Sequence, residues 1–334
     1  MFANWTWMAV WILSLGSAGA LPASGESARP SELAHTYSIV AYDLETGQVG
    51  AAVQSHWFSV GSIVIWAQAG VGAVATQSFV KVDYGPLGLR GMAAGEPPQA
   101  LLKRLTGEDE AQQVRQVALA DVQGRAVAHT GSQCIAQACD LQGKGFSVQA
   151  NMMLNDTVCR AMKEAFENSK GSLARRLSAA LQAAQAQGGD IRGRQSAALK
   201  VVSAEKPEHP WQGVLVDLRV DDHPNPLQEL ERLLGVQEAY QAMNQGDLAI
   251  EHEQMEEALQ HYRRAESMLP NRLEPRFWHA VQLVNVERLE EALPIFRAVF
   301  AQEKNWLELA RRLVKVDLLP SDPAILEAIE KQGK

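Results

Sequence analysis

The segment TYSIVAYDLETGQVGAAVQS, residues 36–55, has the pattern of a β-hairpin. β-Branched residues are concentrated in 36–43 and 49–55, which predicts a strand in each range. Gly47 lies in the five-residue connection between them, where a tight turn favours a residue that tolerates positive φ. Two antiparallel strands are therefore expected near the start of the folded chain.

Outward from this hairpin, the apolar runs predict further strands at 70–79, 115–121, 125–129, 146–149, 196–202 and 214–220. Two helices are expected before the last two strands. Asp156 can cap the first, which continues to Phe166, and Ser172 can cap the second, which stops at Gly188-Gly189. The order is strands, helices, strands, with hairpins and no βαβ units. This order favours an α+β protein with antiparallel sheets.

From Pro226 onward the sequence is helical in character and repeats itself. MEEAL at 255–259 recurs as LEEAL at 289–293, and 289 − 255 gives a period of 34. This is the period of tetratricopeptide repeats, in which each unit is a pair of helices. We therefore expect residues 225–334 to form an all-α, tetratricopeptide-like domain, with Ala258 and Ala292 at helix–helix contacts. An ordinary bundle of helical hairpins is the alternative.

Composition excludes some classes of function. The chain has 334 residues, and 31 Lys+Arg against 39 Asp+Glu gives a net charge of −8. Apolar residues make up 46% and charged residues 21%, which is ordinary for a folded protein of about two domains. A nucleic-acid-binding protein would present a basic face, so the acidic balance argues against that class.

The first residues resemble a secretory signal. Residues 1–20 contain no acid or base, 7–13 are apolar, and Ala18-Gly19-Ala20 offers the small residues that a signal peptidase prefers. The run is too short to span a membrane. We expect residues 1–20 to be removed, 21–34 to form a flexible leader, and the protein to be periplasmic or secreted. An N-terminal anchor and a cytosolic location are the alternatives.

The three cysteines leave their pairing open. In an oxidising compartment Cys134 and Cys139 could close a small loop and leave Cys159 unpaired, or all three could be buried thiols. The spacing contains no CxxC pair and no Cys/His finger, so no structural zinc site is indicated. Asp221, Asp222 and His223 are adjacent residues, and adjacent side chains on a strand face opposite ways. The three side chains therefore cannot converge on one ion. No metal or other cofactor is expected.

Common catalytic signatures are absent from the sequence. Hydroxyl and amide residues do gather at predicted strand ends, where burial requires a partner or a function; they are Thr36, Ser38, Ser55, Thr76, Gln77, Asn151 and Ser196. Residues 189–195 form a charged, glycine-containing approach to the strand at 196–202. That approach suits an anionic or amide-like group. Turn chemistry and polarity at a sheet edge are the alternative explanation.

These residues carry a resemblance to a known family. Residues 35–224 resemble the uncharacterised family called domain of unknown function 1028, which is similar in fold to N-terminal nucleophile hydrolases. The matching blocks are HTYSIVA at 35–41, GVGAVATQ at 70–77, YGP at 84–86, HTG at 129–131, VQANM at 148–152, GGD at 188–190, RQSAAL at 194–199 and DLRVDDHP at 217–224. The resemblance implies a four-layer αββα sandwich, with two antiparallel sheets between helix layers.

The resemblance also implies a nucleophile. In that superfamily the first residue of the first strand attacks an amide carbonyl, and its own α-amino group serves as the base. The matching position here is Thr36. Signal cleavage after Ala20 leaves residues 21–35 before it, so its nitrogen is then an amide. Either a second cleavage after His35 exposes Thr36, or the domain is not a hydrolase of this type.

The leading hypothesis is therefore hydrolysis of an amide bond in a small or peptide-like substrate. Thr36 is the expected nucleophile, Asn151 an oxyanion donor and Arg194 a substrate clamp. Ser55, Thr76, Gln77 and Ser196 would line the same concave pocket. The competing hypothesis is a non-enzymatic binding or assembly protein, in which the repeat groove holds a partner peptide and the sandwich serves as scaffold.

Overall fold

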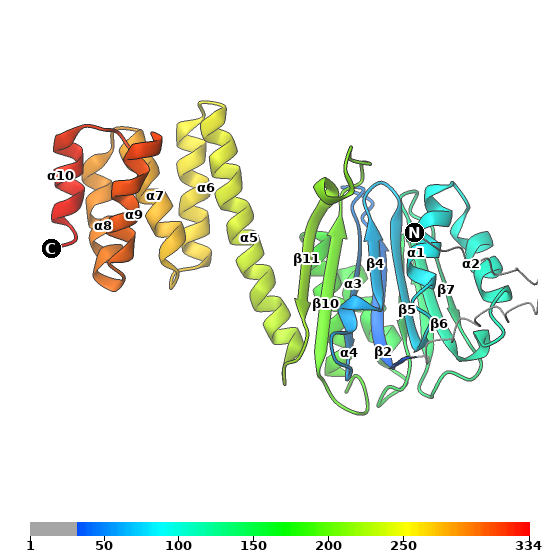
Figure 1. Cartoon of the computed structure of the whole chain (residues 1–334). Coiled ribbons are helices and arrows are strands. Elements are labelled where there is room, and N and C mark those ends of the chain that lie inside the picture. Colours follow the sequence, from blue (N-terminus) through cyan, green and yellow to red (C-terminus); the bar gives the residue numbers. More distant parts are fainter. Residues whose placement is uncertain (1–31) are drawn as a thin grey trace, which may run out of the picture. The chain divides into compact units, whose positions relative to one another are not determined.

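The computed structural model describes residues 32–334, in which two antiparallel β-sheets and ten α-helices form (Figure 1). The predicted α+β class with antiparallel sheets is confirmed at this level, as is the helical character of the C-terminal region. The predicted signal peptide and most of the predicted leader lie outside the described residues.

One sheet has six strands in the order β11-β10-β3-β2-β9-β8. Its strands are β2 (Thr36–Tyr42), β3 (Val49–Ser55), β8 (Cys139–Gly143), β9 (Phe146–Ala150), β10 (Ser196–Val202) and β11 (Val214–Val220). The predicted hairpin is the β2–β3 pair, whose register joins Thr36 to Ser55 and Tyr42 to Val49. Gly47 has φ +72° in the connection, as the turn requires.

The second sheet has five strands: β1 (Glu32–Ala34), β4 (Ile65–Gln68), β5 (Gly72–Val80), β6 (Arg115–Asp121) and β7 (Ala126–Thr130). Residues 32–34, which the sequence analysis placed in the flexible leader, form the short strand β1. They pair with β5, because β4 covers the edge of β5 only at residues 72–75 and leaves the backbone groups near Ser78 to be satisfied by β1.

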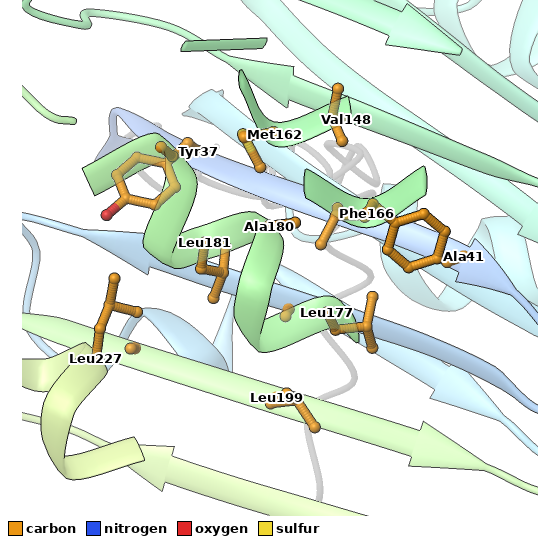
Figure 2. Close-up of a cluster of buried hydrophobic side chains, with 14 of the residues drawn as sticks. Tyr37, Ala41, Val148, Met162, Phe166, Leu177, Ala180, Leu181, Leu199 and Leu227 are labelled. Atoms are coloured by element: carbon orange, nitrogen blue, oxygen red, sulfur yellow. The ribbon is translucent and has the colours of Figure 1, made fainter. Parts of the chain in front are cut away.

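Side chains alternate between the two faces of each strand, which sets the layers. In β2, Tyr37, Ile39 and Ala41 face outward into a buried cluster that includes residues of α3 (Val158–Asn168) and α4 (Leu173–Ala186). Figure 2 shows Met162, Phe166 and Leu181 of these helices gathered over the strands. The other outer face, on β5 and β6, packs against α1 (Tyr84–Ala93) and α2 (Pro98–Gly107).

The inner faces of the two sheets pack on each other through small residues. Apart from Ile65, every buried member of this cluster is Ala or Val, among them Val40, Val53, Ala75 and Ala118. Such side chains let the sheets approach closely. Thr36 and Ser38 lie on this same inner face of β2, so their hydroxyls are directed between the sheets.

Several elements differ from the expectations. The helices at 84–93 and 98–107 and the strands β4 and β8 were not predicted, because glycines and short lengths hide their periodicity. Ser172 does cap its helix, its hydroxyl accepting from the Arg175 amide. Asp156 does not cap the preceding helix, which starts at Val158 after Thr157.

The disulfide joins Cys139 to Cys159, and Cys134 is free, so the suggested Cys134–Cys139 loop is wrong. The reason is topological. Cys139 opens β8 at the edge of the six-stranded sheet, while Cys159 lies in the first turn of α3, which packs over β8 and β9. Contact between these two elements brings together cysteines that are 20 residues apart.

Helices α5 (Pro226–Glu251), α6 (Met255–Met268), α7 (Leu273–Asn285), α8 (Leu289–Gln302), α9 (Asn305–Leu313) and α10 (Pro323–Lys331) make up the C-terminal region. α6 and α8 begin 34 residues apart and also end 34 residues apart. Glu253 and Glu287, each just before these helices, have positive φ of 61° and 62°. Ala258 and Ala292 are both fully buried. The repeat in sequence is therefore also a repeat in local structure.

The long helix α5 contributes to two cores. Leu227, Leu230 and Leu234 belong to the cluster on the outer face of the six-stranded sheet, whereas Ala242 and Met243 belong to a cluster with α6. Among residues 32–334, no helix is long and apolar enough to cross a membrane.

Candidate functional site

The junction between His35 and Thr36 is where the chain leaves one sheet and enters the other. Ala34 ends β1 opposite Ser78 of the five-stranded sheet, and Thr36 starts β2 opposite Ser55 of the six-stranded sheet. Both junction residues are buried, with exposed fractions of 2% for His35 and 0% for Thr36. The peptide bond between them therefore lies in the space between the sheets, away from solvent.

Two side chains hold the carbonyl oxygen of His35. The Ser55 hydroxyl donates to it over 2.7 Å, and Nη2 of Arg192 donates over 2.8 Å. The arginine bond is charge-assisted and is among the stronger kinds of hydrogen bond. This carbonyl belongs to the amide immediately before Thr36. Two donors aimed at one carbonyl oxygen are the arrangement that stabilises an oxyanion in acyl transfer.

Asp190 fixes the direction of the Arg192 side chain. Its buried carboxylate accepts from Nε of Arg192 over 3.0 Å and from Nη2 over 2.8 Å, which is a two-point ion pair. It also accepts from the backbone amides of Arg192 and His56. Gly193, with φ +115°, allows the turn that folds Arg192 back over Asp190. The guanidinium is thus held in one orientation toward the His35 carbonyl.

The His35 ring lies in a closed pocket. Its Nδ1 is 2.8 Å from Oδ1 of Asn151, and the Phe79 ring packs edge-on at a centroid distance of 5.7 Å. The Asn151 amide nitrogen donates to Gln116, so its oxygen faces the histidine and Nδ1–H is the donor. Burial, aided by the charge of Arg192, lowers the pKa of His35 below 6.5, against the opposing effects of Asn151 and Asp190. The ring is therefore neutral at pH 7.

A network of buried amide side chains holds the backbone of Thr36 from the opposite sheet. Nε2 of Gln77 donates to the Thr36 carbonyl over 3.1 Å and to Oε1 of Gln116 over 2.7 Å. The backbone amide of Asn151 donates to the same Thr36 carbonyl over 3.1 Å. Buried amides that are satisfied in this way fix one arrangement of the groups around them.

Ser38 and Gln149 extend this network along the inner face. Ser38 donates to Oε1 of Gln77 over 2.6 Å, and Nε2 of Gln149 donates to the Ser38 hydroxyl over 2.6 Å. Gln77 therefore has its acceptor and its donors engaged at once. The side chain that the sequence placed in the pocket acts here as a structural support beneath Thr36.

Thr36, Ser55 and Ser196 form one row across three neighbouring strands. The Thr36 hydroxyl donates to the Ala34 carbonyl over 2.8 Å, within its own chain segment. Ser196 donates to the Trp57 carbonyl and accepts from the Val60 amide over 3.1 Å, so it secures the turn after β3. Of the three hydroxyls, only that of Ser55 reaches the His35 carbonyl.

Two of the residues singled out from the sequence are not brought to Thr36. Thr76 lies on the helix-facing side of β5, since its neighbour Gln77 takes the inner face, and its hydroxyl donates to the Lys81 carbonyl over 3.2 Å. Arg194 is exposed. The arginine that reaches the site is Arg192, two residues earlier, because Asp190 draws it back.

Sequence reasoning missed His35, Asp190 and Arg192. An acid and a base two residues apart between glycines, as in GDIRG at 189–193, is a local signal that could have indicated the ion pair. His35 carried no such signal, because its partners Phe79 and Asn151 are distant in sequence. Within the described part of the chain, no three His, Cys, Asp or Glu side chains are placed to hold a metal ion.

Comparison with known proteins gives a family but no reaction. The profile of a family described as "Family of unknown function (DUF1028)" matches residues 36–230, which is more than half of the chain. A crystal structure of protein SPO2555 from Silicibacter pomeroyi, described as a DUF1028 protein, is similar with 33% sequence identity and a TM-score of 0.54. That similarity covers 60% of this chain and 88% of the other. No curated protein matches the chain.

Proposed function

This chain belongs to the DUF1028 family, and we propose that it is an exported amide hydrolase that activates itself by cutting the peptide bond between His35 and Thr36. The observation that carries the proposal is the pair of donors, Ser55 and Arg192, on the carbonyl oxygen of that bond. The family match also begins at Thr36. The cut would make the first residue of the matched region the first residue of the mature chain.

The cleavage is an acyl shift followed by hydrolysis. The Thr36 hydroxyl turns from the Ala34 carbonyl and its oxygen bonds to the carbonyl carbon of His35. The oxyanion that forms is held by Ser55 and Arg192. The bond from that carbon to the Thr36 nitrogen then breaks, and the hydroxyl proton ends on the released amine. Water hydrolyses the resulting ester, which leaves a carboxylate on His35 and restores the Thr36 hydroxyl.

After the cut, Thr36 has both a hydroxyl and a free α-amino group, the pair that lets an N-terminal residue act as nucleophile and base together. Gln77 and the Asn151 amide still hold its carbonyl. Once His35 has left, Ser55 and Arg192 are free to receive the carbonyl of a substrate amide. The proposed reaction is hydrolysis of an amide in a small or peptide-like substrate.

Two antiparallel sheets with helices on each outer face support a resemblance to N-terminal nucleophile hydrolases. This fold-level likeness adds to the site geometry and does not replace it. The Cys139–Cys159 disulfide supports the proposal of export, because disulfides persist in oxidising compartments such as the periplasm.

For the C-terminal region we propose a tetratricopeptide-like array that binds a protein partner. The 34-residue offset between α6 and α8 supports this, together with the buried alanines Ala258 and Ala292 at equivalent positions. The role as a partner-binding module is separate from the reaction at Thr36.

The direct test is the N-terminus of the mature protein. The full chain is expressed with export, purified from the periplasm, and its intact mass and N-terminal sequence are determined. We expect a chain that starts at Thr36, and a chain that starts near Leu21 when Thr36 is replaced by Ala. Wild-type protein that keeps residues 21–35 would favour the competing scaffold function.

A matched pair of variants tests the donors. Arg192→Ala removes the guanidinium on the His35 carbonyl, whereas Arg194→Ala removes an exposed guanidinium two residues away. We expect the uncut precursor to accumulate only in Arg192→Ala. Equal processing of both variants would show that the hydrogen bond from Arg192 to the His35 carbonyl does not contribute to cleavage.

A further inference from the structure

One edge of β5 is shared by two short strands. β6 covers the other edge along residues 72–78, while the shared edge pairs with β4 at 72–75 and with β1 at 78–80. β1 thus continues the line of β4 with a ladder of three residues. This ladder runs directly into His35 and the bond that we propose to be cut.

We propose that residues 32–35 occupy, before the cut, the place of the substrate, so that the enzyme acts on an extended peptide that pairs antiparallel with β5 at Ser78–Val80. The residue before the substrate's scissile bond would then take the place of His35, and the one before it the place of Ala34. This inference rests on the proposed function and names the substrate class for that same site.

A three-residue ladder is too short to hold a separate peptide for long. While residues 32–35 are joined to Thr36, their pairing with β5 is intramolecular and costs little entropy. Once the bond is cut, the leader is a free peptide and dissociates by mass action. The backbone groups of β5 that paired with β1 are then open, and an extended substrate can satisfy them by adding a strand.

The pocket of His35 selects for a neutral side chain that donates a hydrogen bond. The acceptor in the pocket is Oδ1 of Asn151, and the ring of Phe79 forms one wall. A lysine would bring a second positive charge beside Arg192, and the Asp190 carboxylate there is already paired with Arg192. A carboxylate would face the Asn151 oxygen without a donor. Histidine meets neither penalty.

The pocket of Ala34 selects for a small side chain. Ala34 has an exposed fraction of 0% and belongs to the tightly packed Ala/Val cluster between the sheets. A larger side chain there has no space to occupy without moving both sheets. The expected motif is therefore a small residue followed by histidine, immediately before the bond that is cut.

The experiment uses the matured protein, residues 36–334, and the fluorogenic peptide Ser-Glu-Leu-Ala-His-aminomethylcoumarin, which copies residues 31–35. We expect release of the coumarin, with kcat/KM at least tenfold lower when the histidine is replaced by Asp or Lys and when the alanine is replaced by Leu. Phe79→Leu should reduce the preference for histidine over leucine at the final position, and Trp211→Leu, at an exposed aromatic residue of the short helix 210–213, should not change it.

A second readout does not depend on turnover. Hydrogen exchange of backbone amides at 78–80 should be slow in the uncut Thr36→Ala chain, fast in the matured protein, and slow again when the free peptide Ser-Glu-Leu-Ala-His is added. Mature protein that starts at Thr36 but shows neither the sequence preference nor this protection would overturn the inference alone. Failure of the wild-type chain to be cut would overturn the proposed function and this inference together.

Discussion

Replacing Ser55 by Ala should slow the proposed cleavage strongly and lower the free energy of unfolding only slightly. The hydroxyl of Ser55 makes one hydrogen bond, to that carbonyl over 2.7 Å, and the residue is fully buried on the inner face of β3. Its loss should cost about 1 kcal/mol of folding free energy, as for one neutral hydrogen bond. Loss of an oxyanion donor costs far more in rate, about 100-fold or roughly 2.7 kcal/mol in the barrier.

The assay follows the conversion of precursor to mature chain by intact mass after a pulse of synthesis. We expect Ser55→Ala to mature about 100 times more slowly than the wild type, while its melting temperature falls by only a few degrees. Arg192 stays in place in this variant, so some conversion should persist.

Ser62→Ala is the matched control, because the Ser62 hydroxyl likewise donates to a backbone carbonyl, that of Ser59, over 2.8 Å. That carbonyl takes no part in the proposed cleavage, so this variant should mature at the wild-type rate. Maturation of Ser55→Ala within threefold of the wild type would refute the assignment of Ser55 as an oxyanion donor.

Three further predictions concern the whole chain. Burial lowers the pKa of the His35 ring, so on acidification this ring is protonated in the unfolded chain before it is protonated in the folded chain. The Thr36→Ala precursor should therefore lose stability as pH falls through about 6.5. Urea titrations at pH 7.5 and 5.5 should show this loss, and it should be smaller when His35→Gln is added. Ala292→Leu should destabilise the helical region by about 1–3 kcal/mol, whereas Ala298→Leu, on the exposed side of the same helix, should be nearly neutral in thermal melts. Cys159→Ser removes a disulfide that closes a loop of 20 residues, and should lower the unfolding free energy by about 3 kcal/mol in denaturant titrations; an unchanged midpoint would contradict this.

Features set by local periodicity could be predicted from the sequence. The hairpin at 36–55 has β-branched residues in both strands and a glycine in its connection, and the structure has the antiparallel β2–β3 pair there. The 34-residue period likewise fixed the equivalent positions Ala258 and Ala292, which are both buried. The hairpin signal lies within the hairpin itself, and the repeat signal is a fixed spacing along the chain.

Features set by contacts between distant elements could not be predicted. Which of Thr76 and Gln77 faces the site depends on where β5 lies against the other sheet, and a shift of one residue exchanges their faces. Which arginine reaches the His35 carbonyl depends on the ion pair with Asp190. The partner of Cys139 depends on the packing of α3 over β8. The face that Thr76 takes and the partner of Cys139 leave no trace in the local sequence, and the ion pair leaves only the short motif GDIRG at 189–193.

The buried amides between the sheets have a consequence for how this layer can change during evolution. A surface made of Ala and Val is smooth, and by itself would hold two sheets almost equally well in several relative positions. Gln77, Gln116 and Asn151 are matched donor to acceptor in one position only, so a slip by one residue would leave several of them unsatisfied. Replacement of a single amide by an apolar residue leaves its hydrogen-bond partners unsatisfied, whereas joint replacement of the amides does not. Accepted substitutions in this layer should therefore occur in concert, and family members should carry either the whole set of amides or none of it.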